Sequence, residues 1–137
     1  MEESHLAVAI IVIASRVERK LDIHAASWQV MQDLISSLLF GKGSPTIGSV
    51  EALLILSENP PRQSEPGTDK ETIVAEQILS WNLVGTAIRF GYFLSLDQTT
   101  FETVEYEQPH DNSNVVASQL LQRQRLAWTY CYLFDRQ

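Results

Sequence analysis

The chain has 137 residues, of which 45% are hydrophobic and 20% are charged, and its formal net charge is −7. This composition is too apolar for a disordered chain and sufficient for one domain with its own core. Lys and Arg are few and scattered, so we expect no direct DNA binding, because contacts to phosphates need concentrated positive charge.

Neither a membrane span nor export is expected. The longest apolar run, Leu6 to Ala14, has nine residues, whereas a membrane helix needs about 20. Glu2 and Glu3 stand where a secretory signal carries positive charge. The single cysteine, Cys131, can form neither an internal disulfide nor a metal site by itself, which favours a reducing intracellular compartment.

The first two of five expected helices cover about residues 4–20 and 22–40. The first has a β-branched middle that local preference also allows as a strand, but its length favours a buried helix. Asp22 is the expected N-cap of the second helix, and Gly41 is suited to the position just after its end.

The third helix is expected to begin near Thr46 or Ser49 and to end before Pro60. Ser49 and Glu51 do not form a capping box, because their spacing is two residues rather than three. The Pro- and Gly-rich segment 58–69 is expected to be a loop.

The fourth helix is expected to run from a cap at Thr68 or Asp69 to about Leu96. Positions on one face recur at steps of three and four residues: Val74, Ile78, Trp81, Gly85, Ile88 and Tyr92. Glycine inside a helix costs about 1 kcal/mol relative to alanine and is tolerated where another backbone comes close. Gly85 and Gly91 therefore predict that this is the central helix, packed on several sides.

The acidic segment 97–113 is expected to be a surface loop, and a fifth helix is expected from about residue 114 to the end. No Gly or Pro ends that helix, so we expect the domain to be truncated at its C-terminal end. Tyr132, Leu133 and Phe134 should then be uncovered, and the isolated chain should associate or be poorly soluble.

No catalytic or metal-binding residue is expected, so the chain is not predicted to be an enzyme. Residues 41–44, GKGS, lack the spacing of a phosphate loop. His5, His24 and His110 are far apart and are expected at the surface or at helix caps. Cys131 lies in an aromatic helix and is expected to behave as a small hydrophobic residue.

Two further interpretations stay open at this point. Trp28, Trp81 and Trp128 either belong to the core or line a ligand pocket, and the core is favoured. Arg89 either forms a partly buried ion pair with Asp135, at the end of the fifth helix, or reaches solvent.

Three blocks of sequence carry a family signal. Residues 49–58 precede Pro60-Pro61-Arg62, then a W-x-x-x-G-x-A-I-R block follows, and finally an R-x-R-x-x-W…D-R block. In this order they resemble the middle homology, or regulatory, domain of fungal binuclear zinc-cluster transcription factors. The motif residues, which we expect to be structural, are Trp81, Gly85, Ile88, Arg89, Arg125, Trp128, Asp135 and Arg136.

This resemblance implies an all-α, multi-helix regulatory domain over residues 1–137, active in the nucleus in transcription by RNA polymerase II. The six-cysteine zinc cluster that binds DNA in this family is N-terminal to the domain and absent here, so zinc and DNA are implied only for the full-length relative. The chain itself would act through intramolecular contacts, a protein partner, a homodimer or a small-molecule effector. A helical small-molecule-sensing or protein-interaction domain without a link to DNA is the alternative.

Overall fold

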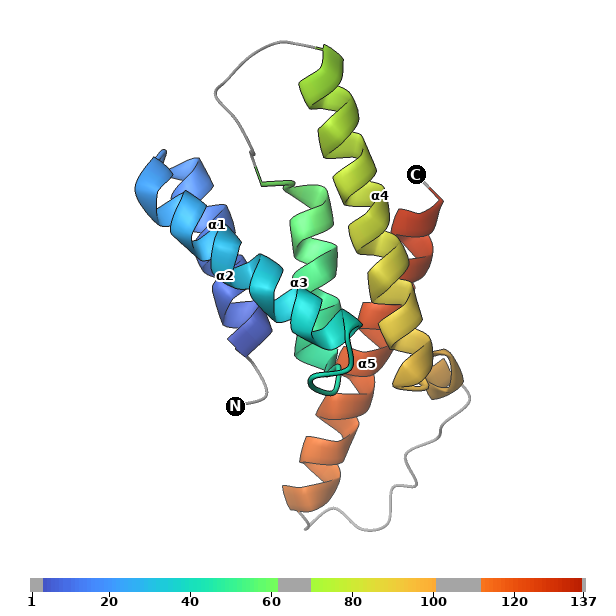
Figure 1. The fold of residues 1–137 in the computed structure, drawn as a ribbon. Helices are drawn as coiled ribbons and strands as arrows, with labels where there is room; N and C mark the ends of the chain where they lie inside the picture. Colours follow the sequence, from blue (N-terminus) through green and yellow to red (C-terminus); the bar gives the residue numbers. More distant parts are fainter. Residues whose placement is uncertain (1–3, 62–69, 101–111, 137) are drawn as a thin grey trace.

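The computed structural model describes residues 4–61, 70–100 and 112–136 (Figure 1). These ranges contain α1 (Ser4–Val17), α2 (Leu21–Leu39), α3 (Ile47–Glu58), α4 (Lys70–Phe93), the 3₁₀-helix η1 (Leu96–Thr100) and α5 (Asn112–Asp135), and they contain no strand. The all-α, multi-helix prediction is confirmed. The expected caps Thr68 and Asp69, His110 and most of the acidic segment lie outside the described residues.

Helix α3 is the centre of the arrangement (Figure 1). It contacts α1 on one side and both α4 and α5 on the other, while α2 packs against α1. Its buried residues occupy every face, namely Gly48, Ser49, Val50, Ala52, Leu53, Leu54, Leu56 and Ser57. The prediction that the fourth helix is the central one is therefore wrong.

Helix α4 buries a different face from the expected one. Its buried residues are Leu83, Val84, Ala87 and Gly91. Trp81 is 75% exposed, and Val74, Ile78 and Tyr92 are also exposed. Figure 1 shows that the first turns of α4 extend past the end of α3.

One core joins all five α-helices. Val12 of α1, Met31 of α2, Leu53 of α3, Ala87 of α4 and Cys131 of α5 are fully buried members of the same cluster. Apolar burial of this kind supplies about 25 cal/mol per Å² and is the main stabilising contribution to the fold.

The helix ends follow local chemistry. Gly41 has a φ of 72°, and the N–H groups of Gly41 and Lys42 donate to the carbonyls of Leu38 and Ser37, which closes α2 with a Schellman motif. The prediction for Gly41 is confirmed. Asp22 is not the N-cap of α2, because that position belongs to Lys20, and Asp22 lies in the first turn.

The N-terminus of α3 carries a capping box that the sequence analysis missed. The N–H of Ser49 donates to Thr46 Oγ1 at 3.2 Å, and the N–H of Thr46 donates to Ser49 Oγ at 2.7 Å. Ser49 is buried and Thr46 is half-buried. They lie at the N-terminal end of α3, the helix at the centre of the core. The box therefore satisfies two backbone donors that would otherwise be costly to bury.

His24 is buried, so the expectation that it lies at the surface or at a cap is wrong. Its Nδ1 lies 3.0 Å from the carbonyl oxygen of Val12, which ties α2 to α1. Nε2 is buried without a hydrogen-bond partner. His5 of α1 is half-buried, and desolvation lowers its pKa.

Candidate functional site

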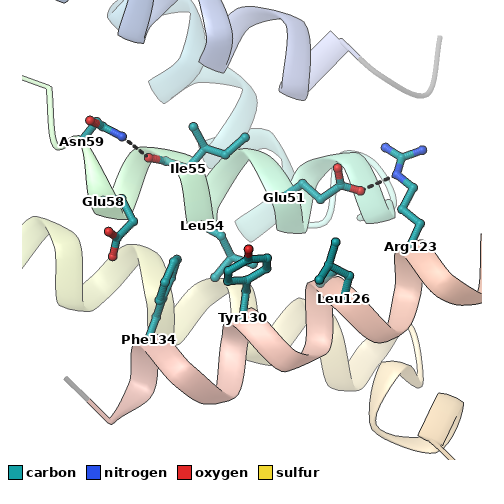
Figure 2. Close-up of a pocket in the computed structure, with 10 residues that line it drawn as sticks. Glu51, Leu54, Ile55, Glu58, Asn59, Arg123, Leu126, Tyr130 and Phe134 are labelled. Atoms are coloured by element: carbon teal, nitrogen blue, oxygen red, sulfur yellow. Dashed lines mark hydrogen bonds and ion pairs between the residues drawn. The ribbon is translucent and has the colours of Figure 1, made fainter.

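A hollow of about 420 Å³ lies between α3 and α5, and we name it the α3–α5 groove (Figure 2). Leu54 and Ile55 of α3 line one side, and Leu126, Tyr130 and Phe134 of α5 line the other. The three α5 residues are four positions apart, so they lie in one row along the helix. In Figure 2 these three side chains point from α5 toward α3. With Leu54 and Ile55 they make the lining of the groove largely apolar.

Charged groups mark the two ends of the α3–α5 groove. Arg123 of α5 donates from Nε to Glu51 Oε1 of α3 at one end, and both side chains are half-buried. Glu58 and Asn59 lie at the other end, where Asn59 Nδ2 donates to the carbonyl of Ile55 at 3.3 Å. The Glu51–Arg123 ion pair links α3 to α5 at this end of the groove.

A second hollow, of about 540 Å³, lies where the end of α3, the first half of α4 and the end of α5 meet. We name it the acidic groove, because Glu58, Glu76 and Asp135 line it and no Lys or Arg is among its lining residues in the described parts of the chain. Trp81 and Phe134 supply its aromatic surface. The two grooves share Glu58 and Phe134, so they are adjacent parts of one surface.

The two grooves have the lining of a surface that binds a ligand or a partner. Apolar walls with polar groups at the rims are typical of ligand and partner sites. Within residues 4–61, 70–100 and 112–136, no three His, Cys, Asp or Glu side chains are placed to share a metal ion. Among these residues, no helix is long and apolar enough to cross a membrane.

The structure brings part of the second and third family-like blocks together. The rings of Trp128 and Tyr92 form a T-shaped pair with centroids 5.0 Å apart, and both Trp128 and Ile88 contact the core. A Cβ added to Gly91 would lie 2.9 Å from Trp128 Cζ3. Arg125 Nε donates to the carbonyl of Thr99 at 2.8 Å and so ties α5 to η1.

The other motif residues lie at the surface. Trp81 and Asp135 line the acidic groove, whereas Arg89 is exposed further along α4. Gly85 is half-buried, and an added Cβ would meet only Arg89 Nη1, at 4.0 Å. No close backbone approach therefore explains Gly85. Arg136 stacks over Tyr132 at 4.4 Å from the ring centroid.

The structure decides two interpretations that the sequence left open. The favoured placement in the core is confirmed for Trp28 and Trp128 and is wrong for Trp81. Trp28 is in the core, Trp128 packs against it and Trp81 is exposed, so the three tryptophans do not line one pocket. The hypothesis of an Arg89–Asp135 ion pair is wrong. In the described ranges, the ion pairs join Lys20 with Glu18 and Arg123 with Glu51.

Cys131 is fully buried, as expected for a small hydrophobic residue. Burial raises the pKa of its thiol to about 11. The thiol is therefore protonated near neutral pH and is not a reactive nucleophile in the folded state.

Sequence reasoning did not find the charged residues of the two grooves. Glu51 and Arg123 are 72 positions apart, and no local pattern links them. Glu58 and Glu76 resemble solvated residues at a helix end and on a helix face. Their proximity depends on how α3, α4 and α5 pack.

Comparisons with known proteins identify no relative. No protein-family model matches the chain, and neither a curated protein nor a solved structure matches it.

Proposed function

We propose that the chain is the regulatory domain of a fungal zinc-cluster transcription factor and controls transcription by RNA polymerase II in the nucleus. The order of the three sequence blocks, residues 49–62, 81–89 and 123–136, carries this proposal. The blocks fall largely on α3, α4 and α5, which contact one another.

The proposed mode of action is control through contacts rather than through DNA. The net charge of −7 opposes direct binding to a polyanion. The zinc of the family does not fit this chain, because a six-cysteine cluster is needed and the single cysteine is buried in the core. In the full-length relative, a separate zinc cluster would therefore read DNA, while these helices bind a partner or mask another segment.

A reporter assay tests the proposal. The chain is placed between a heterologous DNA-binding domain and an activation domain in fungal cells, and a helical domain of equal size without regulatory function replaces it in the control. We expect the chain to change reporter transcription relative to the control, because masking or recruitment requires two states with different contacts. Equal transcription from both fusions at equal protein levels would contradict a regulatory role.

A second candidate function is a small-molecule sensor without a link to DNA, and the α3–α5 groove favours it. Its volume of about 420 Å³ and its apolar lining lie within the range of ligand sites. Titration with indole as a probe should shift the methyl NMR signals of Leu54 and Leu126 but not those of Leu39, which is exposed on α2. Equal shifts at all three residues would remove this candidate.

A further inference from the structure

The acidic groove combines features that select a particular kind of partner. Its three carboxylates come from three helices, Glu58 from α3, Glu76 from α4 and Asp135 from α5. Glu58 and Asp135 are exposed, and Glu76 is half-buried. In the described parts of the chain, none of the three is joined to a basic side chain by an ion pair. The groove therefore has negative charge that its own lining does not neutralise.

Two basic side chains of the described chain lie beside the acidic groove, and neither forms an ion pair with its carboxylates. Arg136 is next to Asp135 but stacks on Tyr132. Arg16 lies at the Pro60 rim, where its Nη1 donates to the Pro60 carbonyl. Because the lining carboxylates are not ion-paired, electrostatic complementarity favours an occupant that carries positive charge.

Between the carboxylates lies an apolar and aromatic surface. Trp81 is 75% exposed, Ile73 is 51% exposed, and Phe134 and Val84 form the deeper part of the lining. Exposed Trp at such a position is costly to leave in water and is enriched among the residues that dominate binding energy. A purely ionic partner would leave this surface uncovered.

We propose that the acidic groove is the docking site for a basic amphipathic helix of a protein partner. A large apolar side chain of the partner packs between Trp81 and Phe134. Lys or Arg residues on the flanking turns of the partner face Glu58, Glu76 and Asp135. This inference specifies the partner contact of the proposed function, and the peptide assay below tests it independently of the reporter assay.

Fluorescence anisotropy with labelled peptides tests the proposal. The probe is a Leu/Lys amphipathic peptide of about five helical turns. One comparison peptide replaces Lys with Glu, and the other replaces Leu with Gln and keeps the charge. We expect the Leu/Lys peptide to bind at least about tenfold more tightly than either comparison peptide, and to weaken with added salt.

Two sets of variants locate the binding. The triple variant Glu58→Gln, Glu76→Gln and Asp135→Asn should weaken binding of the Leu/Lys peptide by about tenfold or more. A matched variant, Glu18→Gln, Asp22→Asn and Asp33→Asn, removes three exposed carboxylates near α2 and should leave binding unchanged. Trp81→Ala should weaken binding without unfolding, because the indole is largely exposed.

Several results would overturn the proposal. Equal losses in the two triple variants would show that the net charge of the chain, rather than the groove, attracts the peptide. Equal binding of the Leu/Lys and Gln/Lys peptides would show that Trp81 and Phe134 take no part. Loss of self-association in Trp81→Ala, measured by sedimentation, would assign the groove to a second copy of the chain instead.

Discussion

At the scale of single residues, the two glycines of α4 have opposite surroundings. A Cβ at Gly91 would lie 2.9 Å from Trp128 Cζ3 and 3.1 Å from Cε3, whereas at Gly85 it would meet no atom closer than 4.0 Å. The ring of Trp128 packs against Tyr92 and the core, so it has little freedom to move away. Gly91 is therefore required by close packing, and Gly85 is not.

Alanine substitutions at these two positions should change stability in opposite directions. Gly85→Ala should raise the free energy of unfolding by about 0.5–1 kcal/mol, because alanine is the better helix former. Gly91→Ala gains the same propensity but overpacks the Trp128 contact, which costs about 1–3 kcal/mol. We expect a net loss for Gly91→Ala in urea unfolding, and equal stabilisation by both substitutions would contradict this account.

The raised pKa of Cys131 predicts how the stability of the fold depends on pH. The pKa of its thiol is raised from 9.0 to about 11 in the folded state, which favours the protonated form. The contribution of the protonated thiol to folding stability is complete below the unfolded pKa and is lost as pH rises from about 9 to 11, and a two-unit difference is worth about 3 kcal/mol.

Unfolding measured across this pH range should therefore show a steeper loss of stability in the unmodified chain than in Cys131→Ala. A thiol reagent near pH 8 should modify Cys131 only as the chain unfolds, because the side chain is fully buried. Rapid modification of the folded chain would show that this part of α5 is accessible.

The spacing of apolar residues led to the wrong prediction of which face of α4 is buried, because this helix has two apolar stripes. Leu83, Val84, Ala87 and Gly91 are also spaced by about one turn, and these smaller or aliphatic residues face the core. The larger aromatic residues, Trp81 and Tyr92, suggested the other face. The choice between the stripes depends on where α3 and α5 lie, which no local pattern contains.

At the scale of elements, the sequence predicted most of the helices because Gly and Pro separate them. Gly41 ends α2, and Pro60 follows the end of α3. The capping box of α3 was missed because Ser49, rather than Glu or Gln, occupies its third position. The sequence also did not reveal that α3, the shortest α-helix, is the most buried one, because this depends on its neighbours.

Removal of the α3 cap should destabilise the fold. Thr46→Ala removes the acceptor for the Ser49 N–H at the N-terminus of α3. We expect the free energy of unfolding, measured by heat or urea, to fall by about 1 kcal/mol. Thr86→Ala is the matched control, because Thr86 is mid-helix and its hydroxyl only donates back to the Asn82 carbonyl. The control should be neutral or slightly stabilising, and a similar loss in both would contradict the capping role.

At the scale of the whole molecule, large apolar side chains remain exposed at the end of α5. Tyr132 and Leu133 are about half exposed, as expected from the sequence, whereas Phe134 is half-buried against the core. Such surface favours association. The candidate grooves could not be predicted, because residues from separate helices form them.

Sedimentation velocity should therefore show concentration-dependent association of the chain. The double variant Tyr132→Glu and Leu133→Glu should reduce association, because it places charge on the exposed apolar surface of α5. Val17→Glu with Leu21→Glu, at the exposed turn between α1 and α2, serves as the control and should leave association unchanged. A sharp monomer at all concentrations for the unmodified chain would contradict this prediction.

The assignment to a zinc-cluster regulator is tested most directly by sequencing the complete transcript that encodes these 137 residues. We expect an in-frame segment upstream with six cysteines in zinc-cluster spacing, since the chain itself supplies a single buried cysteine. A complete transcript whose reading frame contains these helices but no such cluster would contradict the central claim.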